Sequence, residues 1–242
     1  MKNKRRHTPK LAKAIIKSTS GTKFTKLFWN NSDNALLYKK IPLNYFRREA
    51  IQGGLDNGCD IKAIKKYIKN AKSILEVGAG YGRVLNHIIK NGFKGKLFAL
   101  EREPKLCRFL EKQFPQVQII CADIRRFITK QKFDLILLMW ANLCDFSQTE
   151  QLPTLKNISS HLNTMGFLIF DLTPVNCKII NATNDDQYNK TMQTPYGENY
   201  GYFPSLNEID QYIQKLNLFK KEIITYTTKT NKKRNLYILQ KD

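Results

Sequence analysis

Long uncharged apolar runs, closely spaced cysteines and clusters of metal-ligand residues are all missing from this sequence of 242 residues. No apolar run approaches the ~18 residues that span a bilayer, and the first residues lack the hydrophobic stretch of a signal peptide. The cysteines are odd in number and no two lie within four residues of each other: Cys59, Cys107, Cys121, Cys144 and Cys177. This spacing argues against a zinc site or a disulfide framework. We therefore expect reduced thiols, no metal and a cytoplasmic location.

Acidic residues are also few. The chain has 41 Lys and Arg against 20 Asp and Glu, a formal net charge of +21, and nine of the basic residues precede the first acidic one, Asp33. Such a charge attracts nucleic acid or an anionic membrane surface. Lysines outnumber arginines by 31 to 10, however, and specific phosphate or guanine recognition usually depends on arginine. A chain that is merely basic and well solvated is therefore slightly favoured over a nucleic-acid partner.

The apolar content points to a folded domain with an N-terminal extension. Hydrophobic residues make up 42% of the chain, which is enough to bury a core. Residues 1–26 are basic and contain no acid, so we expect a disordered tail; a short cationic helix over 9–17 and an organellar transit peptide remain alternatives. Residues 27–60 carry enough apolar side chains for a helical cap, and the regular pattern of the main domain occupies 61–242.

Within the main domain, short apolar segments alternate with amphipathic ones. Five segments are expected as strands: 73–77, 97–100, 117–121, 133–139 and 166–170. Continuous apolar strands between amphipathic helices are typical of a parallel sheet covered on both faces. Two more strands, 222–228 and 235–240, flank a turn-like segment and predict an antiparallel hairpin. The predicted fold class is α/β, a seven-stranded and mostly parallel sheet with helices on both faces and a C-terminal antiparallel hairpin.

The remaining segment of this domain, 172–205, is a long insertion rich in polar residues and tyrosine. Long polar loops at this end of a sheet are often lids or recognition elements. We therefore expect a lid-like loop here. Ser205 and Glu208 then form a predicted capping box that opens the last helix.

A glycine-rich loop joins the first strand to the following helix. Gly78, Gly80 and Gly82 occupy alternate positions, which lets the backbone approach a ligand closely. The loop leads into a helix N-terminus, where free N–H groups favour a carboxylate or a phosphate. A dinucleotide fingerprint would place its third glycine one residue later, where this chain has Arg83, so the loop departs from the NAD(P) pattern.

An acidic residue, Glu76, followed by G-x-G-x-G resembles the first motif of the class I S-adenosylmethionine-dependent methyltransferase family. The similarity continues in order over roughly residues 61–240. Glu101 ends the second strand, where members of the family have an acidic residue that binds both ribose hydroxyls. Asp123 follows the third strand, where members of the family have an aspartate that accepts a hydrogen bond from the adenine amino group. Thr164-Met165-Gly166 replaces the family's Pro-Gly-Gly, a mild departure at a turn. The resemblance implies a Rossmann-like fold, an enzyme, and S-adenosyl-L-methionine as cofactor.

Ten residues of these motifs are the expected cofactor-binding set: Glu76, Gly78, Ala79, Gly80, Gly82, Arg83, Glu101, Arg102, Asp123 and Ile124. One carboxylate can accept from two adjacent hydroxyls, which suits Glu101, and Arg83 can pair with the cofactor's carboxylate. Two alternatives stay open. Glu76 can bond loop amides only, and Asp123 can simply cap the next helix.

Methyl transfer is an in-line displacement that mainly needs proximity, orientation and exclusion of water. The segment after the fourth strand, residues 140–146, is expected to face the methyl group of the cofactor. It lacks the proline-containing motif that is found in family members that methylate nucleic-acid bases. It is more similar to the family members that methylate small molecules. Trp140 and Asn142 are the catalytic candidates, with Trp140 packing on the cofactor and Asn142 orienting an amine or hydroxyl. Trp140 as a core residue, and Asp145 as either a base or a helix cap, remain open.

Three tyrosines are the candidates for acceptor binding: Tyr38 and Tyr45 in the cap, and Tyr200 in the insertion. The predicted function is methyl transfer to nitrogen or oxygen of a small-molecule acceptor. The alternative is an RNA or protein methyltransferase recruited through residues 1–26. A non-catalytic cofactor-binding adaptor is a third possibility, against which the intact cofactor motifs count. The sequence does not indicate the oligomeric state.

Overall fold

The computed structural model describes residues 33–174, 182–184 and 187–242. The expected tail over 1–26, the first residues of the expected cap and part of the 172–205 insertion lie outside the described residues. No helix in the described ranges is long and apolar enough to cross a membrane.

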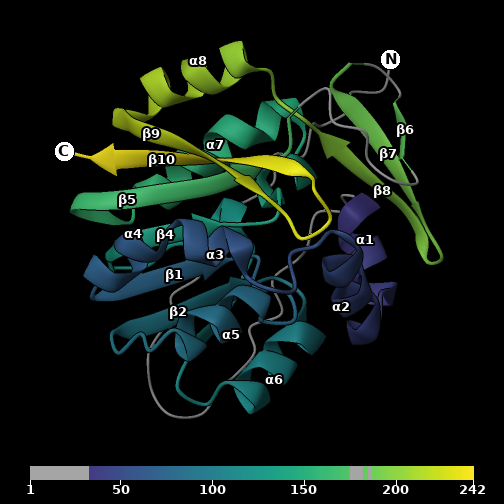
Figure 1. Ribbon diagram of the computed structural model, residues 1–242, viewed down its shortest axis with the longest axis horizontal. Coiled ribbons are helices and arrows are strands. Elements are labelled where there is room, and N and C mark those ends of the chain that lie inside the picture. The colour runs from purple at the N-terminus through teal and green to yellow at the C-terminus, as the bar shows by residue number, and fades with distance from the viewer. Residues whose placement is uncertain (1–32, 175–181, 185–186) are drawn as a thin grey trace, which may run out of the picture.

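A seven-stranded sheet forms the centre of the molecule (Figure 1), in the order β3-β2-β1-β4-β5-β10-β9. Its strands are β1 (Ser73–Val77), β2 (Lys96–Glu101), β3 (Gln118–Cys121), β4 (Phe133–Leu138), β5 (Leu162–Leu172), β9 (Leu218–Thr227) and β10 (Lys233–Lys241). The first five are parallel to one another, and β10 pairs antiparallel with both β5 and β9. The predicted fold class, including its terminal hairpin, is confirmed. The chain direction across the sheet reverses between β1 and β4, which creates a switch point at their carboxyl ends.

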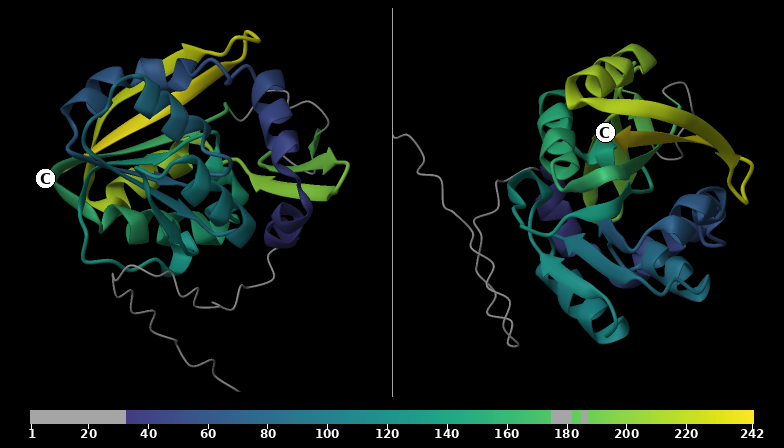
Figure 2. Two further views of the ribbon diagram at one scale, coloured as in Figure 1. Left: turned by 90° about the horizontal axis from the view of Figure 1, so that it is seen from below. Right: turned by 90° about the vertical axis from the view of Figure 1, so that its left-hand side faces the viewer.

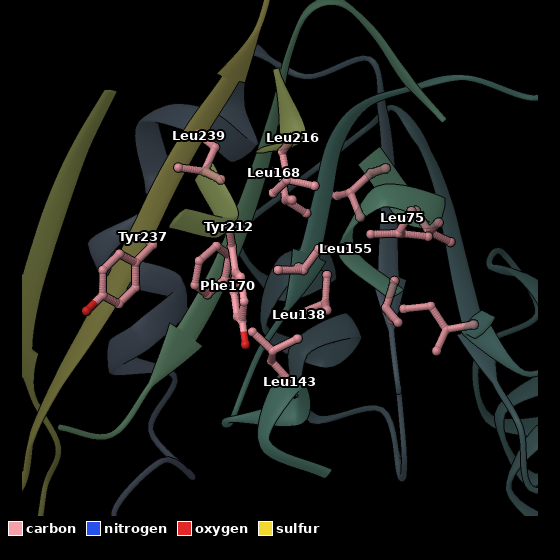
Figure 3. Close-up of a cluster of buried hydrophobic side chains, with 14 of the residues drawn as sticks. Leu75, Leu138, Leu143, Leu155, Leu168, Phe170, Tyr212, Leu216, Tyr237 and Leu239 are labelled. Atoms are coloured by element: carbon pink, nitrogen blue, oxygen red, sulfur yellow. The ribbon is translucent and has the colours of Figure 1, made fainter. Parts of the chain in front are cut away.

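Helices cover both faces of this sheet because successive strand residues point to opposite sides. In β4, Leu135 and Leu137 pack against one set of helices, whereas Ile136 and Leu138 pack against the other. One face carries α3 (Cys59–Ala63), α4 (Lys65–Asn70), α5 (Arg83–Lys90) and α6 (Pro104–Gln113); the opposite face carries α7 (Gln148–Ser159) and α8 (Leu206–Leu216). The core between the sheet and helices α7 and α8 includes the stacked rings of Phe170 and Tyr237, whose centroids lie 5.1 Å apart (Figure 3). Burial on both faces explains why the strands read as unbroken apolar segments.

Local signals set the ends of several helices. The predicted capping box at Ser205 and Glu208 is present at the start of α8, and a second one joins Ser147 and Glu150 at the start of α7. Each box satisfies N–H groups that lack a partner inside the helix. Helix α6 ends at Gln113, two residues before Pro115.

Two N-terminal helices and a small second sheet lie at the carboxyl ends of the parallel strands (Figures 1 and 2). The helices are α1 (Asp33–Lys40) and α2 (Leu43–Gln52), and the sheet is formed by β6 (Ala182–Asn184), β7 (Asn189–Thr194) and β8 (Gly197–Tyr202). The side chain of Asn34 in α1 donates to the Tyr200 carbonyl at 2.7 Å and accepts from the Tyr200 N–H at 2.9 Å. These bonds hold α1 against β8. We call this layer of α1, α2 and β6–β8 the roof.

The expectation of a polar loop over the insertion is therefore wrong for 189–202, which forms an antiparallel hairpin. Its strands are composed mainly of polar residues and glycine, and such strands give little of the apolar alternation that marks a strand in a sequence. The pairing is instead supported from outside the segment, by the bonds between Asn34 and Tyr200.

The expectation of reduced cysteines is also wrong for one pair, because Cys107 and Cys121 are joined by a disulfide. Cys107 lies in α6 and Cys121 ends β3, and their Cα atoms are 5.9 Å apart across 14 residues of sequence. The turn at Pro115 folds the helix back beside the strand that follows it. Sequence spacing alone does not reveal such a pairing. Cys59 and Cys144 are free thiols, and Cys177 lies outside the described residues.

Candidate functional site

A pocket of about 380 Å³ lies between the carboxyl ends of the sheet and the roof. The sheet side supplies the glycine loop, the ends of β2 and β3 and the segment after β4; the roof supplies side chains from α1, α2, β7 and the residues beside β8. The location agrees with the rule that open parallel sheets bind ligands beyond their strand ends at a switch point. Segments distant in the sequence therefore enclose one space.

Two glycines of the loop are required by close packing. All three loop glycines have positive φ. A Cβ on Gly78 would lie 2.0 Å from Nδ2 of Asn142, and one on Gly82 would lie 2.3 Å from the ring of Phe114. At Gly80 the nearest atom to such a Cβ is 3.9 Å away, so space is open above its backbone. The loop thus presents bare backbone to the pocket, as the close approach of a ligand requires.

Glu101 anchors the glycine loop from the end of β2. Its Oε2 accepts from the Gly80 N–H at 2.8 Å, and its Oε1 accepts from the N–H groups of Arg102 and Glu103 at 2.8 and 2.9 Å. Burial raises the pKa of this carboxyl, while the three hydrogen bonds oppose that rise. Oε1 thus accepts two hydrogen bonds, whereas Oε2 accepts one and keeps a further lone pair. Glu101 can therefore hold the loop and still accept a hydroxyl donor from a ligand through Oε2.

Glu76 brings an unsatisfied acceptor to the same pocket. The residue is buried, and its Oε2 has no hydrogen-bond partner among the described residues. Burial raises its pKa well above the usual range, and the charge of Arg83 counteracts this rise only partly. A buried acceptor without a donor is costly unless a ligand supplies one. An ammonium group, such as that of the amino-acid end of S-adenosylmethionine, fits this requirement.

Arg83 has a different partner from the expected cofactor carboxylate. Its guanidinium is buried and forms two hydrogen bonds with Asp60, at 2.9 and 2.6 Å, and a third with the Leu55 carbonyl at 3.0 Å. It also lies over the ring of Trp140, 5.8 Å from the centroid. Arg83 lines the pocket, so its pairing with the cofactor carboxylate stays a prediction, although Asp60 already neutralises its charge. Sequence reasoning missed Asp60, whose helix start carries no distinctive motif.

Asp123 caps the short helix that follows β3, which is the alternative that the sequence left open. It accepts from the Arg125 N–H at 2.9 Å and from the Arg125 guanidinium, with a shortest distance of 2.6 Å. Burial acts to raise the pKa of Asp123, but the hydrogen bonds and charge of Arg125 outweigh it and lower the pKa. Asp123 and Ile124 still line the pocket, so their expected place beside a ligand stays a prediction. Arg102 also lines it, with its guanidinium over the Tyr38 ring at 5.2 Å.

The segment after β4 has a constrained backbone. Trp140 and Ala141 have φ values of 56° and 54°, in the left-handed region that costs non-glycine residues roughly 1–2 kcal/mol each. Asp171 of β5 holds both residues: its Oδ2 accepts from the Trp140 N–H at 3.0 Å and its carbonyl accepts from the Ala141 N–H at 3.1 Å. Arg234 of β10 in turn donates to the Asp171 carboxylate at 2.8 Å. No motif in the sequence indicates the pair of Asp171 and Arg234.

Trp140 and Asn142, the catalytic candidates, both line the pocket. The Asn142 amide lies against the glycine loop, and Trp140 is partly buried with its ring packed beside core residues. Trp140 is thus in contact with the core and with the pocket at once. Their catalytic roles stay predictions.

Two of the three tyrosines that were expected to bind the methyl acceptor lie at the pocket. Tyr38 and Tyr45 line it, and the Tyr45 ring meets the edge of Tyr196 with 5.3 Å between centroids. Tyr200 is not among the lining residues: its side chain is 42% exposed and its hydroxyl donates to Glu198. Its neighbour Asn199 lines the pocket instead. Strand residues alternate between two faces, and the sequence did not indicate which tyrosine faces inward.

Comparisons with known proteins agree with this geometry. Residues 74–166 match a family model described as a methyltransferase domain. No curated protein matches the chain in sequence. Among solved structures, an S-adenosylmethionine-dependent methyltransferase from Clostridium acetobutylicum ATCC 824 is 16% identical, with a TM-score of 0.61 over 86% of this chain and 98% of that one.

Two further structures share the fold. S-adenosylmethionine-bound CalS10, an amino pentose methyltransferase from Micromonospora echinaspora, is 14% identical, with a TM-score of 0.59 over 90% of this chain and all of that one. The glycopeptide N-methyltransferase MtfA is 10% identical, with a TM-score of 0.63 over 78% of this chain and 97% of that one. Residues 74–166 therefore match a methyltransferase domain, and the chain shares its fold with solved structures of S-adenosylmethionine-dependent methyltransferases.

Proposed function

We propose that this enzyme transfers the methyl group to nitrogen or oxygen of a small-molecule acceptor. The observation that carries the proposal is the roof, whose α1, α2 and β7 stand over the strand ends and supply part of the pocket wall. The pocket's volume of about 380 Å³ falls in the range of small-molecule sites, roughly 300–1,000 Å³.

The residues around the pocket supply what methyl transfer requires. The bound cofactor brings a methyl group that is already activated. Tyr38, Phe46 and Phe203 line the pocket with aromatic rings, which exclude water from the reacting atoms. Asn142, fixed against the glycine loop, orients the acceptor, and the helices and small sheet of the roof act as cap and lid.

The structural comparisons support a small acceptor. The CalS10 structure is named as an amino pentose methyltransferase and the MtfA structure as a glycopeptide N-methyltransferase. Both share the fold of this chain, and the amino pentose enzyme is covered along its whole length. These names place carbohydrate-containing and nitrogen-bearing compounds first among the acceptors to test.

The second candidate is a methyltransferase for RNA or protein. The observation that favours it is the cluster of nine basic residues within positions 1–26, with no acid among them. Such a segment would recruit an anionic partner to the enzyme.

A screen of metabolite and RNA pools distinguishes the two candidates. Full-length enzyme is incubated with cofactor, and products are detected by a mass gain of one methyl group. A matched variant replaces the nine basic residues of 1–26 with glutamine. The proposal predicts a methylated small molecule whose yield is equal in both proteins and insensitive to salt. Methylation of RNA alone, lost in the variant and suppressed by salt through counterion release, would contradict it.

A further inference from the structure

We propose that Asp145 is a further catalytic residue, which selects an amine as the acceptor and takes the proton that its nitrogen loses. The inference rests on the proposed function. Asp145 ends the short helix η2 (Asn142–Asp145) and lines the pocket three residues after Asn142. It therefore stands on the same short element as a catalytic candidate, at the side of the pocket that the roof covers.

Only one of the two carboxylate oxygens of Asp145 accepts a hydrogen bond from the described residues. Its Oδ2 accepts from the Tyr38 hydroxyl at 2.8 Å. In the described part of the chain, Oδ1 accepts no hydrogen bond and no cation forms an ion pair with the carboxylate. A partly buried carboxylate without a cationic partner gains from binding a positively charged ligand. Oδ1 supplies the acceptor atom for such a group.

Aromatic rings next to Asp145 favour a cation as well. Tyr38, Phe146 and Phe203 all line the same pocket. Each ring already attracts a protein cation, with Arg102 at 5.2 Å, Arg125 at 5.9 Å and Lys190 at 5.6 Å from the respective centroids. An ammonium group is attracted both by a carboxylate and by the faces of aromatic rings. A neutral hydroxyl can donate a hydrogen bond to the carboxylate but gains little from the rings. The pocket therefore favours an amine over an alcohol of the same shape.

The charges around Asp145 leave it able to exchange a proton near neutrality. Burial raises its pKa to about 6, while the Arg102 charge and the Tyr38 hydrogen bond act to lower it and the Glu101 charge to raise it. The neighbouring Cys144 thiol is buried, and its own pKa is raised by that burial. A base with a pKa near the working pH transfers protons most effectively.

The proton balance of the step is simple. The bound ammonium first passes one proton to Oδ1 of Asp145, which frees the lone pair of its nitrogen, and Oδ1 later releases this proton to solvent. The lone pair then forms the new bond to the methyl carbon, and the electron pair of the broken carbon–sulfur bond stays on sulfur. Nothing else is consumed.

Tyr38 is the positioning residue for Asp145. It lies on α1, and that helix is tied to the segment around Asp145 by the Asn34 amide, which donates to the Asp145 carbonyl at 3.4 Å and to the Tyr200 carbonyl at 2.7 Å. The roof thus carries the hydroxyl that fixes the carboxylate. The amine site is complete only when α1 is docked.

Two variants and a matched control test the inference on the acceptor that the screen identifies. Asp145→Asn keeps the shape but cannot take a proton, and Tyr38→Phe removes only the hydroxyl. Asp210→Asn is the control, because Asp210 lies on α8 away from the pocket and pairs with Lys220. Asp145→Asn should lower kcat about 100-fold or more, with unchanged affinity for S-adenosylhomocysteine, and Asp210→Asn should resemble the parent enzyme.

Two readouts do not depend on turnover. Acceptor affinity is measured by calorimetry on enzyme saturated with S-adenosylhomocysteine, where Asp145→Asn should weaken binding of the amine about tenfold. Carbon-13 spectra of the aspartate carboxyls should show one resonance, absent from Asp145→Asn, that titrates near pH 6. In Tyr38→Phe this titration, and the acid limb of the kcat profile, should move to higher pH because the hydroxyl lowers the Asp145 pKa.

The outcomes separate this inference from the proposed function. An acceptor methylated only on a hydroxyl would overturn the role of Asp145 and leave a small-molecule methyltransferase standing. An amine acceptor with equal kcat and equal affinity in Asp145→Asn would also overturn it. Methylation of RNA or protein alone would refute the proposed function, and the inference with it.

Discussion

Substitution of Asp171 by asparagine should be one of the most damaging single changes in this enzyme. Asp171 is fully buried and joins three parts of the site: its carboxylate receives the Arg234 guanidinium and the Tyr226 hydroxyl, and it holds the Trp140 N–H. Asparagine retains the shape and one oxygen but loses the charge. The Arg234 guanidinium, itself 9% exposed, would remain buried without its counter-ion.

The magnitude follows from that uncompensated charge. Removing one partner of a buried ion pair costs roughly 3–5 kcal/mol. For a chain of this size, 1 kcal/mol corresponds to a shift in Tm of about 2–4 °C, so the Tm of Asp171→Asn should fall by about 6–20 °C. The measurement is urea denaturation followed by circular dichroism, with a thermal scan as the second readout.

A double variant separates the charge from the loop contact. Asp171→Leu combined with Arg234→Met removes both charges at similar volume, which is often close to neutral for stability. It still leaves the Trp140 N–H without an acceptor, at about 1–3 kcal/mol. The double variant should therefore be more stable than Asp171→Asn yet slow in methyl transfer, because the strained backbone at Trp140 and Ala141 is released. A loss below about 1 kcal/mol in Asp171→Asn would refute this reasoning.

Three further predictions concern the cofactor pocket. Glu101→Ala should weaken S-adenosylhomocysteine binding by about 1–3 kcal/mol in calorimetry, because the Gly80 N–H loses its acceptor; an unchanged Kd would exclude that role. Asn142→Ala should leave cofactor affinity intact and reduce kcat, and equal turnover would remove Asn142 from the site. The Asp123 pKa is lowered in the folded state, so its stabilisation is present above the unfolded pKa of about 3.9 and is lost as the pH falls through the folded pKa. Asp123→Asn should therefore flatten the acid loss of stability in urea denaturation, and an unaltered pH dependence would contradict the assignment.

The main sheet was predictable because the pattern that marks each strand or helix lies within its own segment of the sequence. The inner parallel strands are largely buried on both faces and appear as apolar runs, whereas the edge strand β3 is partly exposed. The helices between the strands carry one apolar face. The small sheet over 189–202 was not predictable, because its strands are polar and are held by a partner, Asn34, far away in the sequence. The Cys107–Cys121 disulfide was missed for a similar reason, since it depends on how α6 folds back on β3.

The site residues also divide into those that sequence motifs predicted and those that became evident only in the folded chain. The glycine loop follows β1, and Glu76 and Glu101 lie at the carboxyl ends of β1 and β2, so their motif spacing placed them at one pocket. The partners that fix other site residues come from elsewhere: Asp60 holds Arg83, and the pair of Asp171 and Arg234 holds Trp140. A carboxylate and an arginine that meet only in the folded chain leave no pattern in the sequence. The same applies to Tyr38, whose bond to Asp145 exists only because α1 docks on the strand ends.

We expect S-adenosylmethionine to bind between the strand ends, the glycine loop and the roof. The most direct measurement is a crystal structure of the enzyme grown with S-adenosylhomocysteine. The predicted result is a ligand with its ribose hydroxyls on Glu101, its ammonium on Glu76 and its sulfur facing Trp140 and Asn142. A ligand bound outside this pocket, or no uptake at millimolar concentration, would contradict the account.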